Sequence, residues 1–205
     1  MSNEGTIDFP DSGFEGIVFD CDGTLVNSMP AHFDAWCEAL AVFGAENVIR
    51  EDVFYAMGGR PTTDIVADLN AQYGLRLNPV EVALMKREAY LHRLDSLRPI
   101  DEVVGFARKW RGRVPMAVAS GGARYVVEKT LQAVGISDLF DEVVAAEDVS
   151  AGKPAPDIYL EAADRLGVAP DKCLALEDAP AGIMAAQRAG MTVVGIPALV
   201  ELAVV

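Results

Sequence analysis

Positive charge is scarce in this sequence. Lys and Arg number 17 among 205 residues, against 31 Asp and Glu, so the formal net charge is −14. Nucleic acids and anionic membrane surfaces bind basic surfaces, which so acidic a chain does not offer. We therefore expect neither kind of partner. An anionic substrate would also be repelled overall, so a site for one must be locally positive.

Cysteines and long apolar runs are scarce as well. The three cysteines, Cys21, Cys37 and Cys173, are odd in number and lack metal-ligand spacing, which predicts reduced thiols and a cytoplasmic protein. The polar N-terminus lacks a signal-peptide pattern, and the apolar tail TVVGIPALVELAVV is too short to span a bilayer. We expect that tail to complete a sheet. Nothing in the sequence demands more than a monomer.

Apolar runs alternate with helical patterns in the second half of the chain. Strands are expected at 17–19, 114–119, 142–145, 173–176 and 192–196, and helices around 103–107, 124–134, 156–166 and 181–189. This alternation predicts a parallel sheet with helices on both faces. Between the first two strands, only helical patterns occur, at 30–44, 50–57, 62–74 and 78–97. We predict an α/β core domain of residues 1–28 and 98–205 and an inserted helical domain of residues 29–97.

The stretch IVFDCDGTLVNS, residues 17–28, combines a buried strand with two carboxylates. Asp20 and Asp22 follow the strand directly, and Gly23 permits a turn that lets both converge on one divalent cation. Asp20 is then placed to attack phosphorus, and Asp22 to move protons. The alternative interpretation is a plain Asp-Gly turn at the surface.

Polar residues also follow the other predicted strands, whose carboxyl ends meet at one edge of the sheet. They are Ser120-Gly121-Gly122, Glu147-Asp148 and Glu177-Asp178. Ser120 and the N–H groups beside Gly121 suit a phosphate, unless Ser120 only caps the next helix. Glu177 and Asp178 are oxygen ligands that suit Mg²⁺, unless they only form an acidic helix N-terminus.

Lys153 lies in the segment SAGKPAPDIYL, where Pro154 stiffens the loop. A lysine there offers a point charge to phosphate oxygens or to the carboxylate of a nucleophile. A single lysine is usually only solvated, so this interpretation depends on its order in the chain behind Asp20 and Ser120.

Asp-x-Asp-Gly-Thr, then Ser, then Lys-Pro, then Glu-Asp resembles the four motifs of the haloacid dehalogenase (HAD) superfamily. The resemblance implies a Rossmann-like, doubly wound parallel sheet. It implies that Asp20 forms an aspartyl-phosphate and that Asp22 is the general acid and base. Residues implied to bind the phosphoryl group are Thr24, Ser120, Gly121 and Lys153. The implied Mg²⁺ ligands are Asp20, Asp22 through its backbone oxygen, Glu177 and Asp178.

The inserted helical segment resembles the small cap of the β-phosphoglucomutase-like branch of that superfamily. The segments LEDAPAGIMAAQRAGM, KPAPDIYLEAA and PAHFDAWCEAL carry this likeness, and WRGRVPMAVASG and GGRPTTDIV resemble bacterial fructose-1-phosphatase-type sugar phosphatases. Where the mutases have a cap arginine this chain has Pro61, with Arg60 adjacent as a candidate substitute. His32 and Trp36 match positions near the substrate in the mutases, or they simply pack within a helix.

These observations together predict a Mg²⁺-dependent phosphatase that acts on a small phosphorylated metabolite, such as a fructose-1-phosphate-like sugar phosphate. Two alternatives remain open. One is a β-phosphoglucomutase-like isomerase that returns the phosphoryl group to a reoriented bisphosphate. The other is a receiver-like signalling module, in which a phosphorylated aspartate persists.

Overall fold

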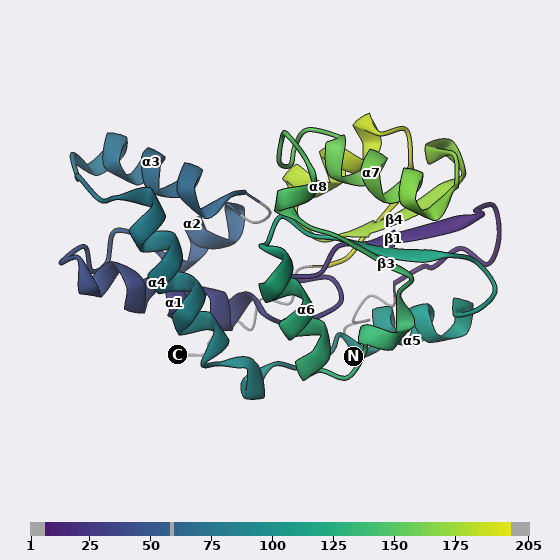
Figure 1. The fold of residues 1–205 in the computed structure, drawn as a ribbon, viewed down its shortest axis with the longest axis horizontal. Coiled ribbons are helices and arrows are strands. Elements are labelled where there is room, and N and C mark those ends of the chain that lie inside the picture. The colour runs from purple at the N-terminus through teal and green to yellow at the C-terminus, as the bar shows by residue number, and fades with distance from the viewer. Residues whose placement is uncertain (1–6, 58–59, 198–205) are drawn as a thin grey trace, which may run out of the picture.

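A central parallel sheet organises the molecule (Figure 1). The computed structural model describes residues 7–57 and 60–197. Its sheet has the order β3-β2-β1-β4-β5, and every neighbouring pair is parallel. The strands are β1 (Gly16–Phe19), β2 (Met116–Ala119), β3 (Glu142–Val144), β4 (Cys173–Glu177) and β5 (Thr192–Gly195). The strand that precedes Asp20 therefore lies in the middle of the sheet.

Side chains alternate along each strand, so the apolar strands present two apolar faces, and helices cover both. Ile17 and Phe19 pack on one face against α5 (Asp101–Trp110) and α6 (Arg124–Ala133). Val18 packs on the other face against α7 (Asp157–Leu166), and α8 (Pro180–Arg188) covers the same face. The predicted α/β fold with a Rossmann-like, doubly wound sheet is confirmed.

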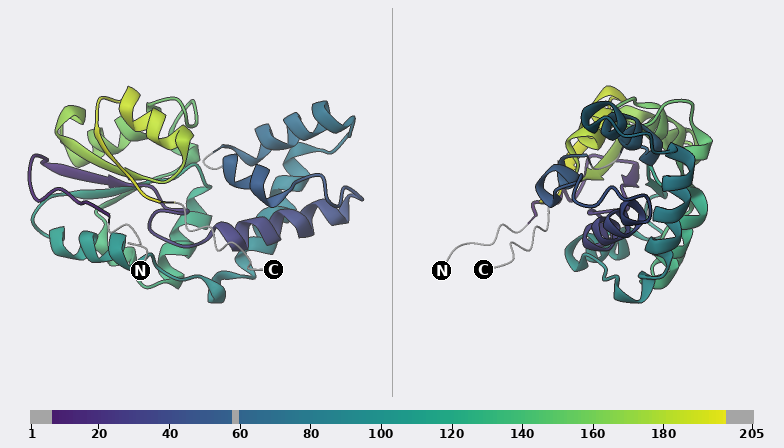
Figure 2. Two further views of the ribbon diagram at one scale, coloured as in Figure 1. Left: turned by 180° about the vertical axis from the view of Figure 1, so that it is seen from behind. Right: turned by 90° about the vertical axis from the view of Figure 1, so that its left-hand side faces the viewer.

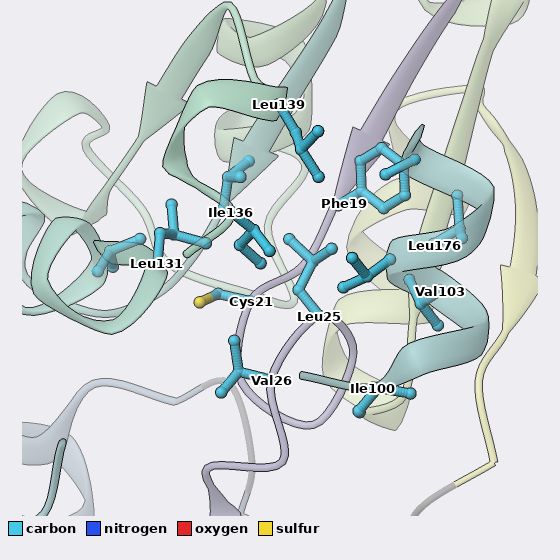
Figure 3. Packing of buried hydrophobic residues seen from close by; sticks show 14 of the residues in the cluster. Phe19, Cys21, Leu25, Val26, Ile100, Val103, Leu131, Ile136, Leu139 and Leu176 are labelled. Carbon is cyan, nitrogen blue, oxygen red and sulfur yellow. The ribbon is translucent and has the colours of Figure 1, made fainter. Parts of the chain in front are cut away.

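The loop after β1 is anchored in the core by its apolar side chains (Figure 3). Cys21, Leu25 and Val26 are fully buried and lie among residues of α5 and α6 and of the segment that follows α6. Apolar and polar residues are interleaved in this loop. Burial of the apolar side chains therefore holds the polar residues between them, such as Asp22 and Thr24, in place. The buried Cys21 is part of this packing.

Four helices lie beside the sheet rather than on either face of it (Figures 1 and 2). They are α1 (Met29–Val42), α2 (Glu51–Ala56), α3 (Thr62–Tyr73) and α4 (Pro79–Leu91). They share an apolar core that includes Trp36, Leu40 and Val82. Asn78 caps α4, as its side-chain oxygen accepts a hydrogen bond from the Val80 N–H at 3.0 Å. We propose the division into core and cap at residues 29–97, which this separate packing supports.

Two chain segments link these helices to the sheet, and they run antiparallel to each other. Val26 bridges to Pro99. The Asn27 N–H donates to the Arg98 carbonyl at 2.9 Å, and the Ile100 N–H donates to the Leu25 carbonyl at 2.9 Å. Both links are therefore held together where they leave the core.

Four short 3₁₀ turns complete the described structure. They are η1 (Leu94–Ser96), η2 (Ser137–Leu139), η3 (Ala146–Asp148) and η4 (Pro170–Lys172). The helix expected at 78–97 is shorter than predicted, because the Arg93 N–H donates to the Tyr90 carbonyl and the chain tightens into η1.

The C-terminal strand β5 pairs with β4, as we expected of the apolar tail. The end of that tail, residues 198–205, lies outside the described residues. Within the described part of the chain, no helix has the length and apolar character needed to cross a membrane.

Candidate active site

The turn after β1 fits tightly against the end of β4. The Asp20 N–H donates to the Leu176 carbonyl at 2.9 Å, which places Asp20, a residue only 5% exposed, at the sheet edge. Gly23 has φ of +89°, and a Cβ on it would lie 2.3 Å from Asp178 Oδ2. The Thr24 hydroxyl donates to Asp178 Oδ1 at 2.9 Å. Only glycine at position 23 allows this approach.

Three carboxylates converge at this edge. Oxygen atoms of Asp20, Glu177 and Asp178 all lie within 4.8 Å of one another. Burial and the Glu177 charge raise the pKa of Asp20 well above its usual range and that of Asp178 to about 7. A divalent cation is the group that such crowded hard oxygens fit best, and Mg²⁺ commonly takes a few carboxylates, with water and phosphate completing its shell.

Lys153 supplies the positive charge of the site. Its ammonium is fully buried and donates to Asp20 Oδ1 at 2.5 Å and to Glu177 Oε2 at 2.6 Å. Burial alone would lower the pKa of Lys153, but Asp20 and Glu177 raise it well above its usual value. The lysine is therefore charged and fixed, not solvated.

Glu177 is held in place from several sides. Its Oε2 accepts a further hydrogen bond from the Tyr159 hydroxyl at 2.5 Å, and its Oε1 accepts one from the Ala179 N–H at 3.1 Å. The side chain also occupies the space above Gly182, where a Cβ would lie 1.9 Å from Glu177 Oε2. Glu177 thus connects α7, through Tyr159, and α8 to Lys153.

Asp22 takes part in a different network from Asp20. Its Oδ1 accepts hydrogen bonds from the Ser28 hydroxyl at 2.6 Å and from His32 Nε2 at 3.0 Å. Burial acts to raise the pKa of Asp22, but His32 and Ser28 outweigh it and hold that pKa below the usual value. The side-chain oxygens of Asp22 are not among the three convergent carboxylates.

Burial and Lys86 together favour the neutral form of His32. Its ammonium lies 3.0 Å from His32 Nδ1, and burial and the Lys86 charge lower the pKa of His32. A neutral ring that accepts at Nδ1 carries its proton on Nε2, which then donates to Asp22. Burial also lowers the pKa of Lys86 itself, to about 8. The resulting chain runs from Lys86 through His32 to Asp22.

Tyr90 connects this chain to the core. Its ring stacks on His32 with centroids 3.9 Å apart, and its hydroxyl lies 2.8 Å from the Thr130 hydroxyl of α6. Helix α4 therefore carries both Lys86, which contacts His32 at Nδ1, and Tyr90, one turn further on, which stacks on the face of the His32 ring.

Two of the phosphate-binding candidates of the core, Ser120 and Gly121, lie on the wall of the cleft, while Thr24 is fully buried and Lys153 is buried against Asp20 and Glu177. Ser120 and Gly121 line the same cleft as Asp20 and Asp22, and Ser120 Oγ accepts a hydrogen bond from the Gly122 N–H at 3.1 Å. Glu147 and Asp148, expected at the same edge, are instead bound by Arg124. They stabilise the start of α6 and do not line the cleft.

The cap contributes several side chains to the cleft, including His32, Trp36 and Arg60. Trp36 is 2% exposed and packs into the apolar core of the cap as well. The Arg60 guanidinium donates to Asp68 of α3 at 2.7 Å. Arg60 therefore lines the cleft while its charge is already paired within the cap.

Three contributors to the site were missed by the sequence analysis. Ser28, Lys86 and Tyr159 each bond to a predicted site residue or its partner. Tyr159 lies in the segment SAGKPAPDIYL that also contains Lys153. Lys86 is 54 positions from His32, and no local pattern links the two.

The comparison with protein families decides how this geometry is to be interpreted. The model for haloacid dehalogenase-like hydrolases matches residues 14–190. The chain belongs to the haloacid dehalogenase-like hydrolases. This confirms the predicted HAD membership and the prediction that the protein is an enzyme.

Several HAD relatives are phosphatases by name. Fructose-1-phosphate phosphatase YqaB of Escherichia coli is 39% identical over 184 residues, covering 89% of this chain and 96% of that protein. Validoxylamine A 7'-phosphate phosphatase of Streptomyces hygroscopicus is 34% identical, covering 87% and 84%. The structure of CbbY from Rhodobacter sphaeroides with xylulose-(1,5)bisphosphate matches at a TM-score of 0.80 and 25% identity, covering 90% of this chain and 86% of CbbY.

Proposed function

We propose that this HAD hydrolase is a Mg²⁺-dependent phosphatase that hydrolyses a small phosphorylated sugar through a phosphorylated Asp20. The observation that carries the proposal is the position of Lys153, whose buried ammonium bonds Asp20 Oδ1 and Glu177 Oε2 beside the three convergent carboxylates. Asp20, Glu177, Asp178 and the backbone oxygen of Asp22 are the proposed Mg²⁺ ligands. Mg²⁺ bound there would supply charge neutralisation for the phosphoryl group.

Asp20 acts as the nucleophile in this proposal, in the ionised form that the Lys153 charge favours and that a bound Mg²⁺ would favour further. Lys153 holds Oδ1 of Asp20, so the other oxygen attacks phosphorus as the bond to the leaving oxygen breaks. The Lys153 ammonium, Ser120 and the N–H groups around Gly121 stabilise the negative charge on the phosphoryl oxygens. Thr24 acts through Asp178, to which its hydroxyl donates, and so positions that carboxylate.

Asp22 acts as the general acid and base. Its carboxylate is ionised before substrate binds. Both hydrogen bonds that described residues make to this carboxylate end on Oδ1, so Oδ2 is the oxygen that takes up and releases the proton. The bound phosphate adds a second negative charge, which raises the pKa of Asp22 and lets it take up a proton. Asp22 gives this proton to the leaving oxygen. It then accepts one from the water that attacks phosphorus, which releases phosphate and restores Asp20.

The substrate class follows from the cleft and from the relatives. The cleft combines the phosphoryl-transfer groups with polar and aromatic cap residues, among them His32, Trp36 and Arg60. The fructose-1-phosphatase relative, which matches over most of both chains, supports a fructose-1-phosphate-like substrate. The paired charge of Arg60 favours a monophosphate over the bisphosphate that a mutase cycle needs. A monomer in the cytoplasm remains the prediction.

The test measures phosphate release from a panel of sugar monophosphates with Mg²⁺. The Asp20→Asn variant should lose at least about a thousandfold in kcat. Asp34→Asn, an exposed carboxylate on α1, is the matched control and should keep full activity. Isomerisation of β-glucose 1-phosphate without net phosphate release would support a mutase instead. A stable phosphorylated Asp20 without turnover would support a signalling module.

A further inference from the structure

The cleft has a second, larger compartment between α4 and the start of α6. Its volume is about 330 Å³, against about 100 Å³ for the compartment that contains Asp20. The residues that line both compartments are Asp22, His32, Thr62, Lys86, Gly121 and Gly122. The two spaces therefore meet beside the proposed acid and base. The second alone reaches the size range of pockets that bury whole small ligands.

The walls of the second compartment are largely apolar. Val80, Ala83 and Leu84 lie on one face of α4, which is the face that carries Lys86 one turn further on. Val80 is 60% and Leu84 48% exposed. Ala123 and Val126 line the compartment as well, from the start of α6. Large apolar side chains exposed on a cleft wall mark a binding surface for an apolar group.

Arg87 adds a cation to this apolar lining. It lies one turn beyond Ala83 and is partly exposed. In the described part of the chain it makes no ion pair of 4.0 Å or less, unlike Arg60 in the first compartment. A guanidinium beside apolar walls suits an aromatic ring, which packs on the aliphatic side chains and stacks on the cation.

We propose that the second compartment binds an aromatic group attached to the sugar phosphate, so that aryl glycoside phosphates are turned over with higher kcat/KM than bare sugar phosphates. The inference rests on the proposed function, because the phosphate must lie beside Asp20. The sugar then lies near His32 and Lys86, and the aryl group contacts Leu84, Val80 and Arg87.

A matched pair of substrates tests this directly. Phosphate release is measured from methyl β-glucoside 6-phosphate and from phenyl β-glucoside 6-phosphate, which differ only in the group on the anomeric oxygen. We expect the phenyl glucoside to have a kcat/KM about tenfold higher, the usual range for one apolar group in a pocket. Leu84→Glu should reduce the ratio of the two kcat/KM values about tenfold. Val42→Glu, at another exposed apolar residue of the cap (59%), should leave both values unchanged.

Each outcome separates the two proposals. Equal kcat/KM for both sugars, or a ratio that Leu84→Glu leaves unchanged, would overturn the aryl subsite while phosphate release upheld the phosphatase. A preference for glucose 1,6-bisphosphate over the phenyl glucoside would also overturn it, since Arg87 would then be binding a second phosphate. No release from any of the three, nor from the panel of sugar monophosphates that includes fructose 1-phosphate, would overturn the proposed function itself.

Discussion

Lys153 brings a positive charge into the most acidic part of an acidic protein. Its side chain has no exposed surface, and its partners Asp20 and Glu177 are almost as fully buried. A buried charge is tolerated only when it is paired and hydrogen-bonded, as it is here. A chain of net charge −14 needs a local positive charge to bind a phosphate. Lys153 supplies that charge from the core, so it does not depend on the charges at the surface.

Lys86 is a positioning residue that acts on Asp22 through His32. Lys86→Met should lower kcat about ten- to a hundredfold, because His32 Nδ1 loses the donor that fixes its tautomer. KM should change less, since Asp20, Ser120 and Lys153 remain. A loss of kcat below twofold would contradict this role.

The same variant has a predicted signature in the dependence of stability on pH. Burial lowers the pKa of Lys86 to about 8 from 10.5, so between these values the unfolded chain binds a proton that the folded chain has lost. The free energy of unfolding of the wild type should therefore rise with pH between 8 and 10.5, and Lys86 should cause no such rise below pH 8. Lys86→Met should lack this rise in urea titrations. Lys109→Met, at a 49% exposed side chain, should retain it.

Sequence reasoning identified the individual candidate site residues but not their hydrogen-bond partners. Asp20 and Ser120 were predictable because each directly follows a strand, and strand ends share an edge. The contact of Lys86 with His32 depends on how α4 packs against α1, which no local pattern specifies. Glu147 and Asp148 satisfied the same strand-end rule yet bind Arg124, because a carboxylate near a free helix N-terminus and an arginine has a closer partner.

At the scale of elements, α8 and β4 meet at a contact that only glycine permits. Gly182 is buried in α8, and Glu177 at the end of β4 fills the space where its side chain would be. The sequence shows a glycine inside a helix, normally unfavourable by about 1 kcal/mol relative to alanine. The structure explains it, since the helix approaches the carboxylate that holds Lys153.

Gly182→Ala should therefore destabilise the protein by about 1–3 kcal/mol, despite the better helix propensity of alanine. It should also lower kcat, because a displaced Glu177 no longer positions Lys153. The matched control is Gly105→Ala in the exposed face of α5, where a Cβ meets nothing within 4 Å. That variant should gain up to about 1 kcal/mol. Equal effects of the two substitutions in urea denaturation would contradict the close contact.

The order and type of most elements were predictable because the sheet is buried on both faces. Its strands are short apolar runs separated by amphipathic helices, and both patterns are read locally. Helix ends were less predictable. The end of α4 depends on a 3₁₀ turn at Arg93, and α2 is only Glu51–Ala56, too short to have a strong periodic signal.

At the scale of the whole molecule, the candidate site lies where two bodies of structure meet. The sheet edge provides Asp20 and Glu177, with Lys153 bonded to both, and the helices of residues 29–97 provide His32 and Lys86. The paired segments around Val26 and Pro99 are the covalent connections between the two. Motion of the helices about these segments would change the access of substrate and water to the cleft.

Metal binding should stabilise the whole fold. Asp20, Glu177 and Asp178 repel one another, and a cation that binds only the folded chain adds about 2.7 kcal/mol at a hundred times its Kd. Saturating Mg²⁺ should then raise Tm by about 5–10 °C in calorimetry, and EDTA should reverse the shift. The control is NaCl at equal ionic strength. An equal shift with NaCl, or an undiminished shift in Asp178→Asn, would contradict the proposed metal site.

The most direct test of Asp20 as the nucleophile is to trap the phosphorylated enzyme. A single turnover with a sugar monophosphate is quenched in acid within milliseconds, and the peptide that contains residues 17–28 is analysed by mass spectrometry after borohydride reduction, which converts an acyl phosphate to an alcohol. We expect transient modification at Asp20 that appears before phosphate is released and is absent in Asp20→Asn. Phosphate release with no modified peptide, or modification at another residue, would contradict it.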